Sequence, residues 1–112
     1  RLLPATTLEE FCQIQAAVED IDVSESVARY ALDVVQATRS DDALELGASP
    51  RTAMSWLRAA RALALLSGRA YVLPDDLKSL AVPLLSHRVV VRGGGTSTEL
   101  VRSIMSRVKP TL

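Results

Sequence analysis

The sequence predicts an all-α fold, a bundle of five helices, and three observations lead to this prediction. Apolar residues recur at three- and four-residue steps through five separate segments. Each segment opens on a helix-start signal, such as Ser49-Pro50 or Pro74-Asp75. Hydrophobic residues make up 48% of the chain but aromatic residues only 4%, so the core is expected to be aliphatic. At 112 residues the chain is one domain that buries roughly two-thirds of its unfolded surface.

The first helix is predicted from its capping residues. Thr6 and Thr7 each stand three residues before a glutamate, so both are candidates for a capping box, and the helix is expected to end near residues 20–22. The single cysteine, Cys12, lies four residues after Leu8 and directly after Phe11, among the apolar positions of this helix. We therefore expect Cys12 to be a small buried side chain rather than a reactive thiol.

The second helix is predicted to start after Ser24 and to end at residues 38–40. The polar stretch that follows, residues 40–45, is expected to be a loop. It leads into the small residues Gly47 and Ala48, after which a third helix begins.

The third helix is predicted from Pro50 to about Ser67, with Ser49 capping its first N–H groups and Gly68 ending it in a left-handed conformation. At 100° per residue, Arg58 falls within about 20° of Arg51, and Arg61 lies about 80° to one side. The opposite face is apolar and is expected to be buried; it comprises Ala53, Trp56, Leu57, Ala60, Leu63 and Ala64.

The arginine face of the third helix is suited to an anion. A helix N-terminus carries unpaired N–H groups and about half a positive charge, and a first-turn arginine adds a fork of donors that fits phosphate oxygens. Arg51 occupies this position. The spacing equally allows Arg51 and Arg58 to be solvated, or to pair with the carboxylates upstream.

The fourth helix is predicted to open at Pro74, and Pro83 within its apolar stripe predicts a kink or a break. Residues 89–91 are expected to form a short strand, with residues 71–72 as the candidate partner. The three glycines at 93–95 indicate a mobile loop.

The last helix is predicted to be capped by Thr96, three residues before Glu99, and to be stopped by Pro110.

Charge is balanced overall but divided along the chain. Residues 1–45 hold ten acids and three bases, a net charge of −7, whereas residues 46–112 hold three acids and ten bases, a net charge of +7. The halves either attract each other within one fold or present a basic face to a ligand or partner.

Several chemistries lack their sequence signatures. The chain has no phosphate-binding loop, no dinucleotide fingerprint and no metal-ligand spacing around His87, which is expected to be a helix-end or structural histidine. It has no signal-peptide pattern and no run of about 20 apolar residues, so we expect a cytoplasmic domain without membrane insertion.

A set of short motifs in fixed order resembles the C-terminal helical lid of MoxR-type AAA+ ATPases over essentially the whole chain. The motifs are Val23-Ser24, Tyr30, Thr38-Arg39, Gly47-Ala48-Ser49-Pro50-Arg51, Ala59-Ala60-Arg61-Ala62, Gly68-Arg69-x-Tyr71-Val72-x-Pro74-x-Asp76 and His87-Arg88.

The resemblance implies the fold, the domain boundaries and the roles of a few residues. Residues 7–112 would be an AAA+ lid, and residues 1–6 a linker from a P-loop domain upstream. Arg51 matches the family's sensor-2 arginine, which approaches the γ-phosphate of ATP. The helix entry that lines the nucleotide pocket is matched by Gly47, Ala48, Ser49 and Pro50. The resemblance assigns no ligand role to Arg69, Tyr71, His87 or Arg88.

The resemblance also implies the setting in which the lid works. The parent protein would be an ATPase that uses ATP and magnesium, assembles as a homo-oligomeric ring and remodels other proteins like a chaperone. Its relatives often act beside proteins with von Willebrand factor A domains. Because the catalytic P-loop residues would lie upstream, the isolated chain is expected neither to hydrolyse ATP nor to bind it tightly.

Two other classes of function fit some of the same features. In a helical protein-interaction module, Arg51 would face a protein carboxylate instead of a nucleotide. In a helical DNA-binding domain, the third helix would be the recognition helix and its arginines would contact phosphates. The zero net charge and the scarcity of aromatic residues disfavour nucleic acid as a partner.

Overall fold

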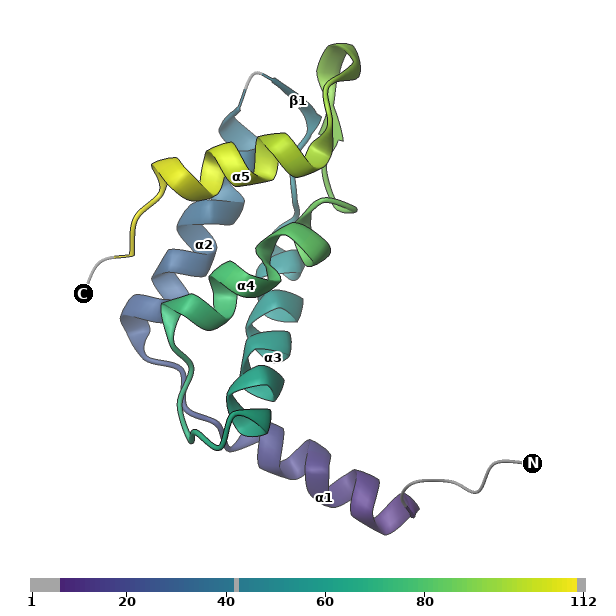
Figure 1. Ribbon diagram of the computed structural model, residues 1–112, viewed down its shortest axis with the longest axis vertical. Helices are drawn as coiled ribbons and strands as arrows, with labels where there is room; N and C mark the ends of the chain where they lie inside the picture. The colour runs from purple at the N-terminus through teal and green to yellow at the C-terminus, as the bar shows by residue number, and fades with distance from the viewer. Residues whose placement is uncertain (1–6, 42, 111–112) are drawn as a thin grey trace.

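The computed structural model describes residues 7–41 and 43–110, and it confirms the all-α class (Figure 1). Within these residues the helices are α1 (Leu8–Glu19), α2 (Glu25–Ser40), α3 (Pro50–Leu66), α4 (Pro74–Leu85) and α5 (Ser97–Arg107). The remaining elements are two short strands, β1 (Leu44–Leu46) and β2 (Val90–Val91), and a 3-10 turn, η1 (Arg92–Gly94). The predicted linker 1–6, with the candidate cap Thr6, lies outside the described residues, so it stays a prediction.

Helix α3 is the element against which α1, α2 and α4 pack, while α5 covers α4 and α2 (Figure 1). Its predicted apolar face is buried at Ala53, Trp56, Ala60 and Ala64 and half-buried at Leu57 and Leu63. The Trp56 ring is fully enclosed, and its indole N–H donates to the carbonyl of Leu77 at 3.0 Å. Ala60 and Ala64 are also fully buried. Their small side chains let the neighbouring helices approach α3 closely.

Helix ends at Thr7, Thr96 and Gly68 form as predicted. Thr7 and Glu10 make a reciprocal capping box, with hydrogen bonds of 3.1 and 3.0 Å. Thr96 accepts a hydrogen bond from the N–H of Glu99 at 3.3 Å. Gly68 follows α3 with φ of +77°, the left-handed conformation that glycine adopts without steric cost.

Helix α1 projects from the lower end of α3 (Figure 1). Leu8, Phe11 and Ile14 keep 78%, 49% and 52% of their surface exposed, and none of the residues of α1 is buried. Cys12 is exposed as well, so its predicted burial is wrong. The apolar spacing of α1 correctly predicts a helix, but no described residues pack around this part of it closely enough to bury its side chains.

The short strand at 90–91 forms, but it does so with a different partner from the one predicted. It pairs antiparallel with β1, Leu44 opposite Val91 and Leu46 opposite Val90. The predicted loop at 40–45 therefore ends in a strand, because Leu44 is apolar and buried against the core.

Residues 71–72, the partner predicted for that strand, pair with the segment between α1 and α2 instead. The N–H of Asp22 donates to Ala70 and its carbonyl accepts from Val72, each at 2.9 Å. Non-local pairings of this kind depend on how the helices pack, which short extended runs do not encode.

Pro83 does not break α4, which continues to Leu85. Because Pro83 lies in the last turn, its missing N–H removes a single hydrogen bond of the helix ladder. The predicted break is therefore wrong, and the helix ends shortly after the proline.

An ion pair ties the end of α3 to the start of α4. Arg69 donates through both terminal nitrogens to the Asp76 carboxylate, at 2.8 and 2.6 Å, and also donates to the carbonyl of Tyr71. Asp76 is only 4% exposed and accepts a further hydrogen bond from the N–H of Leu73 at 2.7 Å. Arg69 and the Leu73 N–H hold the pKa of Asp76 below its ordinary value, although burial opposes this.

This ion pair makes stability depend on pH at the acidic end. The unfolded chain takes up a proton at the ordinary aspartate pKa, whereas folded Asp76 does so only at lower pH. Its contribution is therefore complete above the ordinary pKa and is lost as the pH falls through the folded value. We expect Asp76→Asn to lower the free energy of unfolding by about 1–3 kcal/mol at pH 7, and by less at pH 3, as measured by urea unfolding.

Asp75→Asn is the matched control, because Asp75 is the neighbouring, exposed carboxylate. A loss of stability by Asp76→Asn that is equal at pH 7 and pH 3 would contradict the role given to the Asp76 charge.

Candidate functional site

The candidate site lies at the start of α3. Contacts with the end of α2 hold the residues that lead into this helix. The backbone N–H of Ala48 donates to the hydroxyl of Thr38 at 2.9 Å, and that hydroxyl donates to the carbonyl of Val35 at 2.6 Å. Thr38 and Ala48 are each 1% exposed. Gly47 fits only because it lacks a side chain, since a Cβ there would come within 2.6 Å of the Thr38 carbonyl oxygen.

Ser49 occupies the N-cap position of α3, but its side chain does not cap the helix as predicted. Its hydroxyl instead lies 3.3 Å from that of Thr52, a residue buried in the first turn. Pro50 stands at the first helical position, where its lack of an N–H costs nothing. The buried contacts of Gly47 and Ala48 therefore set the entry into α3, with no side-chain cap from Ser49.

Arg51 is exposed in the first turn of α3. Within residues 7–41 and 43–110 its side chain has neither a hydrogen bond nor an ion pair, so its five donors face solvent. It lines a groove of about 580 Å³. The other residues lining this groove, which we call the α1–α3 groove, are Val18, Met54, Ser55, Arg58, Ala59 and Ala62.

Arg58 lines the same groove but is partly engaged. Its Nε lies 3.9 Å from the carboxylate of Glu19, and both side chains are largely exposed, so the pair contributes little to stability. Arg61 is half-buried and does not line the groove. An upstream carboxylate therefore pairs with Arg58, whereas none of the described carboxylates pairs with Arg51.

The opposite charges of the two halves partly meet inside the fold. Arg107 of α5 donates to the Asp41 carboxylate at 2.6 Å, and Ala43 donates its N–H to the same carboxylate at 2.9 Å. These hydrogen bonds lower the pKa of Asp41. With the Arg58–Glu19 contact, two ion pairs among the described residues join the acidic half to the basic half.

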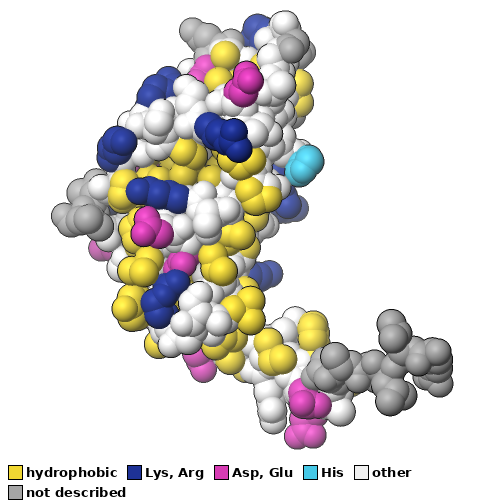
Figure 2. All heavy atoms as spheres, viewed as in Figure 1, with side chains coloured by type: hydrophobic (Ala, Val, Ile, Leu, Met, Phe, Trp, Pro, Cys, Tyr) yellow, Lys and Arg dark blue, Asp and Glu magenta, His cyan; other side chains and the backbone are white. Residues whose placement is uncertain are grey.

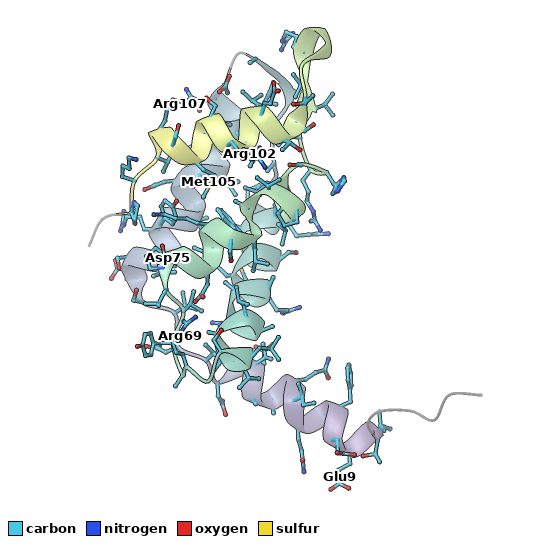
Figure 3. All side chains as sticks on the ribbon, viewed as in Figure 1. Glu9, Arg69, Asp75, Arg102, Met105 and Arg107 are labelled. Atoms are coloured by element: carbon cyan, nitrogen blue, oxygen red, sulfur yellow. The ribbon has the colours of Figure 1, made fainter. Side chains whose placement is uncertain are left out.

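A second cationic surface lies over α4 and α5, where Figure 2 shows Lys and Arg side chains around apolar atoms. It includes a groove of about 400 Å³ lined by Lys78, Ala81, Val82, Arg102, Met105 and Ser106. Figure 3 shows Arg102 and Met105 on α5 and Asp75 at the start of α4. Asp75 lies 4.0 Å from Lys78, so part of this charge is compensated locally.

The remaining motif residues have structural positions or lie at the surface. Arg69 and Asp76 form the ion pair between α3 and α4, and Tyr71 lies beside the Arg69 guanidinium at 6.0 Å. His87 and Arg88 are exposed in the turn after α4. In the part of the chain that the structure describes, no three His, Cys, Asp or Glu side chains form a cluster able to hold a metal ion. No described helix is long and apolar enough to cross a membrane.

Comparison with known proteins agrees with this architecture. Residues 36–107 match the family model described as the AAA lid domain. The chain is 37% identical to the uncharacterized protein YeaC of Bacillus subtilis, over 96% of this chain and 35% of YeaC. It is 31% identical to Chaperone MoxR1 of Mycobacterium tuberculosis, over 92% of this chain and 30% of that protein.

A solved structure has the same fold. The crystal structure of a provisionally assigned ATPase from Cytophaga hutchinsonii superposes with a TM-score of 0.87 at 28% identity, covering 93% of this chain and 36% of that one. The chain thus spans about a third of the length of the relatives that it matches.

The chain belongs to the AAA lid domain family, since the family model covers more than half of it. Its named relatives, which include Protein MoxR of Paracoccus denitrificans at 37% identity over 59% of this chain and 23% of that protein, confirm the resemblance to lids of the MoxR type.

Because Gly47 lies against the end of α2, we expect a single added methyl group at this position to destabilise the fold. Gly47→Ala places a Cβ within 2.6 Å of a backbone oxygen and 2.7 Å of the Arg39 Cα, and backbone atoms cannot rotate away. We expect a loss of about 1–3 kcal/mol in the free energy of unfolding, measured by urea titration.

Gly95→Ala is the matched control for this substitution. Its Cβ would meet only a Val91 methyl group at 3.3 Å, and its φ of −70° suits alanine. Equal stabilities of the Gly47 and Gly95 variants would show that the close approach at Gly47 is not a constraint.

Proposed function

We propose that this chain is the sensor-2 lid of a MoxR-type AAA+ ATPase, which closes over ATP held by a P-loop domain outside the chain. The observation that carries the proposal is Arg51, an exposed arginine in the first turn of the long helix α3, at the edge of the α1–α3 groove. The family supplies the setting, because AAA lid domains are parts of ATPases.

The residues at the start of α3 fit a triphosphate. The side chain of Ser49 does not occupy the first-turn N–H groups, and the helix dipole adds positive potential at this end. Arg51 and Arg58 lie on one face, and no carboxylate of the described residues pairs with Arg51. ATP bound with magnesium would supply the γ-phosphoryl group that is transferred to water.

In this proposal the chain contributes electrostatics and movement. The Arg51 guanidinium donates hydrogen bonds to phosphoryl oxygens whose charge is redistributed during hydrolysis, which lowers the barrier. Because α3 packs against α1, α2 and α4, movement of the lid carries Arg51 toward or away from the phosphate as part of a rigid body. The isolated chain is expected to be inactive, since one side chain does not offset the cost of ordering ATP.

The wider role follows from the family resemblance. A relative is named as a chaperone, which supports remodelling of other proteins as the work of the parent. We extend the proposal to a cytoplasmic homo-oligomeric ring and to partners with von Willebrand factor A domains.

A second candidate function is protein interaction, and the exposed apolar residues of α1 favour it. Leu8, Phe11 and Ile14 present an apolar surface that another domain or subunit can cover. This function is compatible with a lid, which contacts the ATP-binding domain during closure. In the alternative without nucleotide, Arg51 would pair with a protein carboxylate.

Substitution of Arg51 in the full-length protein tests the proposal. We expect Arg51→Ala to lower the kcat of ATP hydrolysis by tenfold or more, about 1.4 kcal/mol of barrier, because the lost interaction is strongest in the transition state. Arg51→Lys is expected to recover only part of the rate, since lysine lacks the fork of donors. The readout is phosphate release at saturating ATP.

Arg29→Ala is the matched control, because Arg29 is an exposed arginine on α2 that pairs only with Glu25 of its own helix among the described residues. If Arg51→Ala hydrolyses ATP as fast as wild type and Arg29→Ala do, Arg51 is a surface charge and the interaction function takes precedence.

A further inference from the structure

Thr38 is connected to the start of α3 by a chain of two buried hydrogen bonds. Its hydroxyl accepts from the N–H of Ala48 at 2.9 Å and donates to the carbonyl of Val35 at 2.6 Å. One hydroxyl therefore joins the last turn of α2 to the residue that stands three positions before Arg51. Burial makes this contact costly to lose, because water cannot replace either partner.

Thr38 also faces Gly47, the residue before Ala48, through its backbone carbonyl. Gly47 lies so close to the Thr38 carbonyl oxygen that no side chain fits between them. Residues 47–48 are therefore fixed by a hydrogen bond to Thr38 and by steric contact with the backbone of Thr38 and Arg39. Ser49 adds no side-chain cap, so the direction in which α3 begins depends on these contacts with the end of α2, in which Thr38 provides the hydrogen bond.

The position of Arg51 follows from this arrangement. Arg51 is exposed and its side chain has no partner within the described residues, so the backbone at the start of α3 sets the Cα position and the direction from which its guanidinium reaches out. Displacements of about 1 Å in catalytic groups can reduce rates by about 100-fold. A small change in the entry of α3 is thus enough to disturb a contact between Arg51 and phosphate.

We propose that Thr38 is a positioning residue for Arg51: its hydroxyl sets the first turn of α3 so that Arg51 reaches the phosphate. Thr38 itself is buried and touches no nucleotide in this account. The inference rests on the sensor-2 function proposed above and adds a residue to it, from a different helix.

The test is ATP hydrolysis by the full-length protein carrying Thr38→Val, which keeps the shape of the side chain and removes the hydroxyl. We expect kcat to fall by about tenfold with little change in KM. Thr38→Ser keeps the hydroxyl and is expected to restore kcat to within about twofold of wild type. An unchanged kcat in Thr38→Val, or no rescue by Thr38→Ser, would overturn the proposal.

A matched control separates positioning from loss of stability. Val101→Ala truncates a buried side chain on α5, a helix that packs against α4 and α2, and is expected to lower the Tm without lowering kcat at 25 °C. If Val101→Ala reduces kcat as much as Thr38→Val does at an equal loss in Tm, the effect of Thr38 is only structural and the proposal fails.

Combining the substitutions separates this inference from the proposed function. If Thr38 acts through Arg51, adding Thr38→Val to Arg51→Ala causes no further loss in kcat. Additive losses in the double variant would contradict the positioning role. An active Arg51→Ala variant would instead refute the sensor-2 function, whereas an inactive Arg51→Ala with an active Thr38→Val would refute the role of Thr38 alone.

Discussion

The structure depends on the burial of one face of α3. Trp56 is fully enclosed and its indole N–H donates a hydrogen bond to the carbonyl of Leu77. The buried Ala53 and Ala60, one turn before and one turn after it, allow α2 and α4 to pack closely. Truncation of a buried tryptophan costs about 3–5 kcal/mol in comparable cores, a large part of the stability of a small domain. With one face buried in this way, the opposite face of α3 is free to carry Arg51 and Arg58.

Most features that depend on a few neighbouring residues could be predicted from the sequence, although Ser49 does not cap α3 because its hydroxyl lies beside that of Thr52. The capping box of Thr7, the cap at Thr96 and the left-handed Gly68 each form through contacts within a single turn. The apolar face of α3 could be predicted because the helical period alone decides which of its side chains face the core. The family resemblance rests on motifs of the same kind, and the lid fold confirms it.

Features that depend on distant residues could not be predicted in the same way. Leu44 pairs with Val91 across almost half of the chain, and short apolar runs do not specify their partner. Cys12 has the spacing of a buried residue, but α1 projects from the bundle and leaves it exposed. At the site, the role proposed for Arg51 came from its position in a motif, whereas the role proposed for Thr38 rests on a hydrogen bond with Ala48, ten positions away.

The central claim is that Arg51 contacts the γ-phosphate when the lid closes. The most direct test is a structure of the full-length protein with a non-hydrolysable ATP analogue and magnesium. The account predicts that a terminal nitrogen of Arg51 lies within about 3 Å of a γ-phosphate oxygen. An analogue held by the P-loop domain with Arg51 still in solvent, or paired with a protein carboxylate, would contradict it.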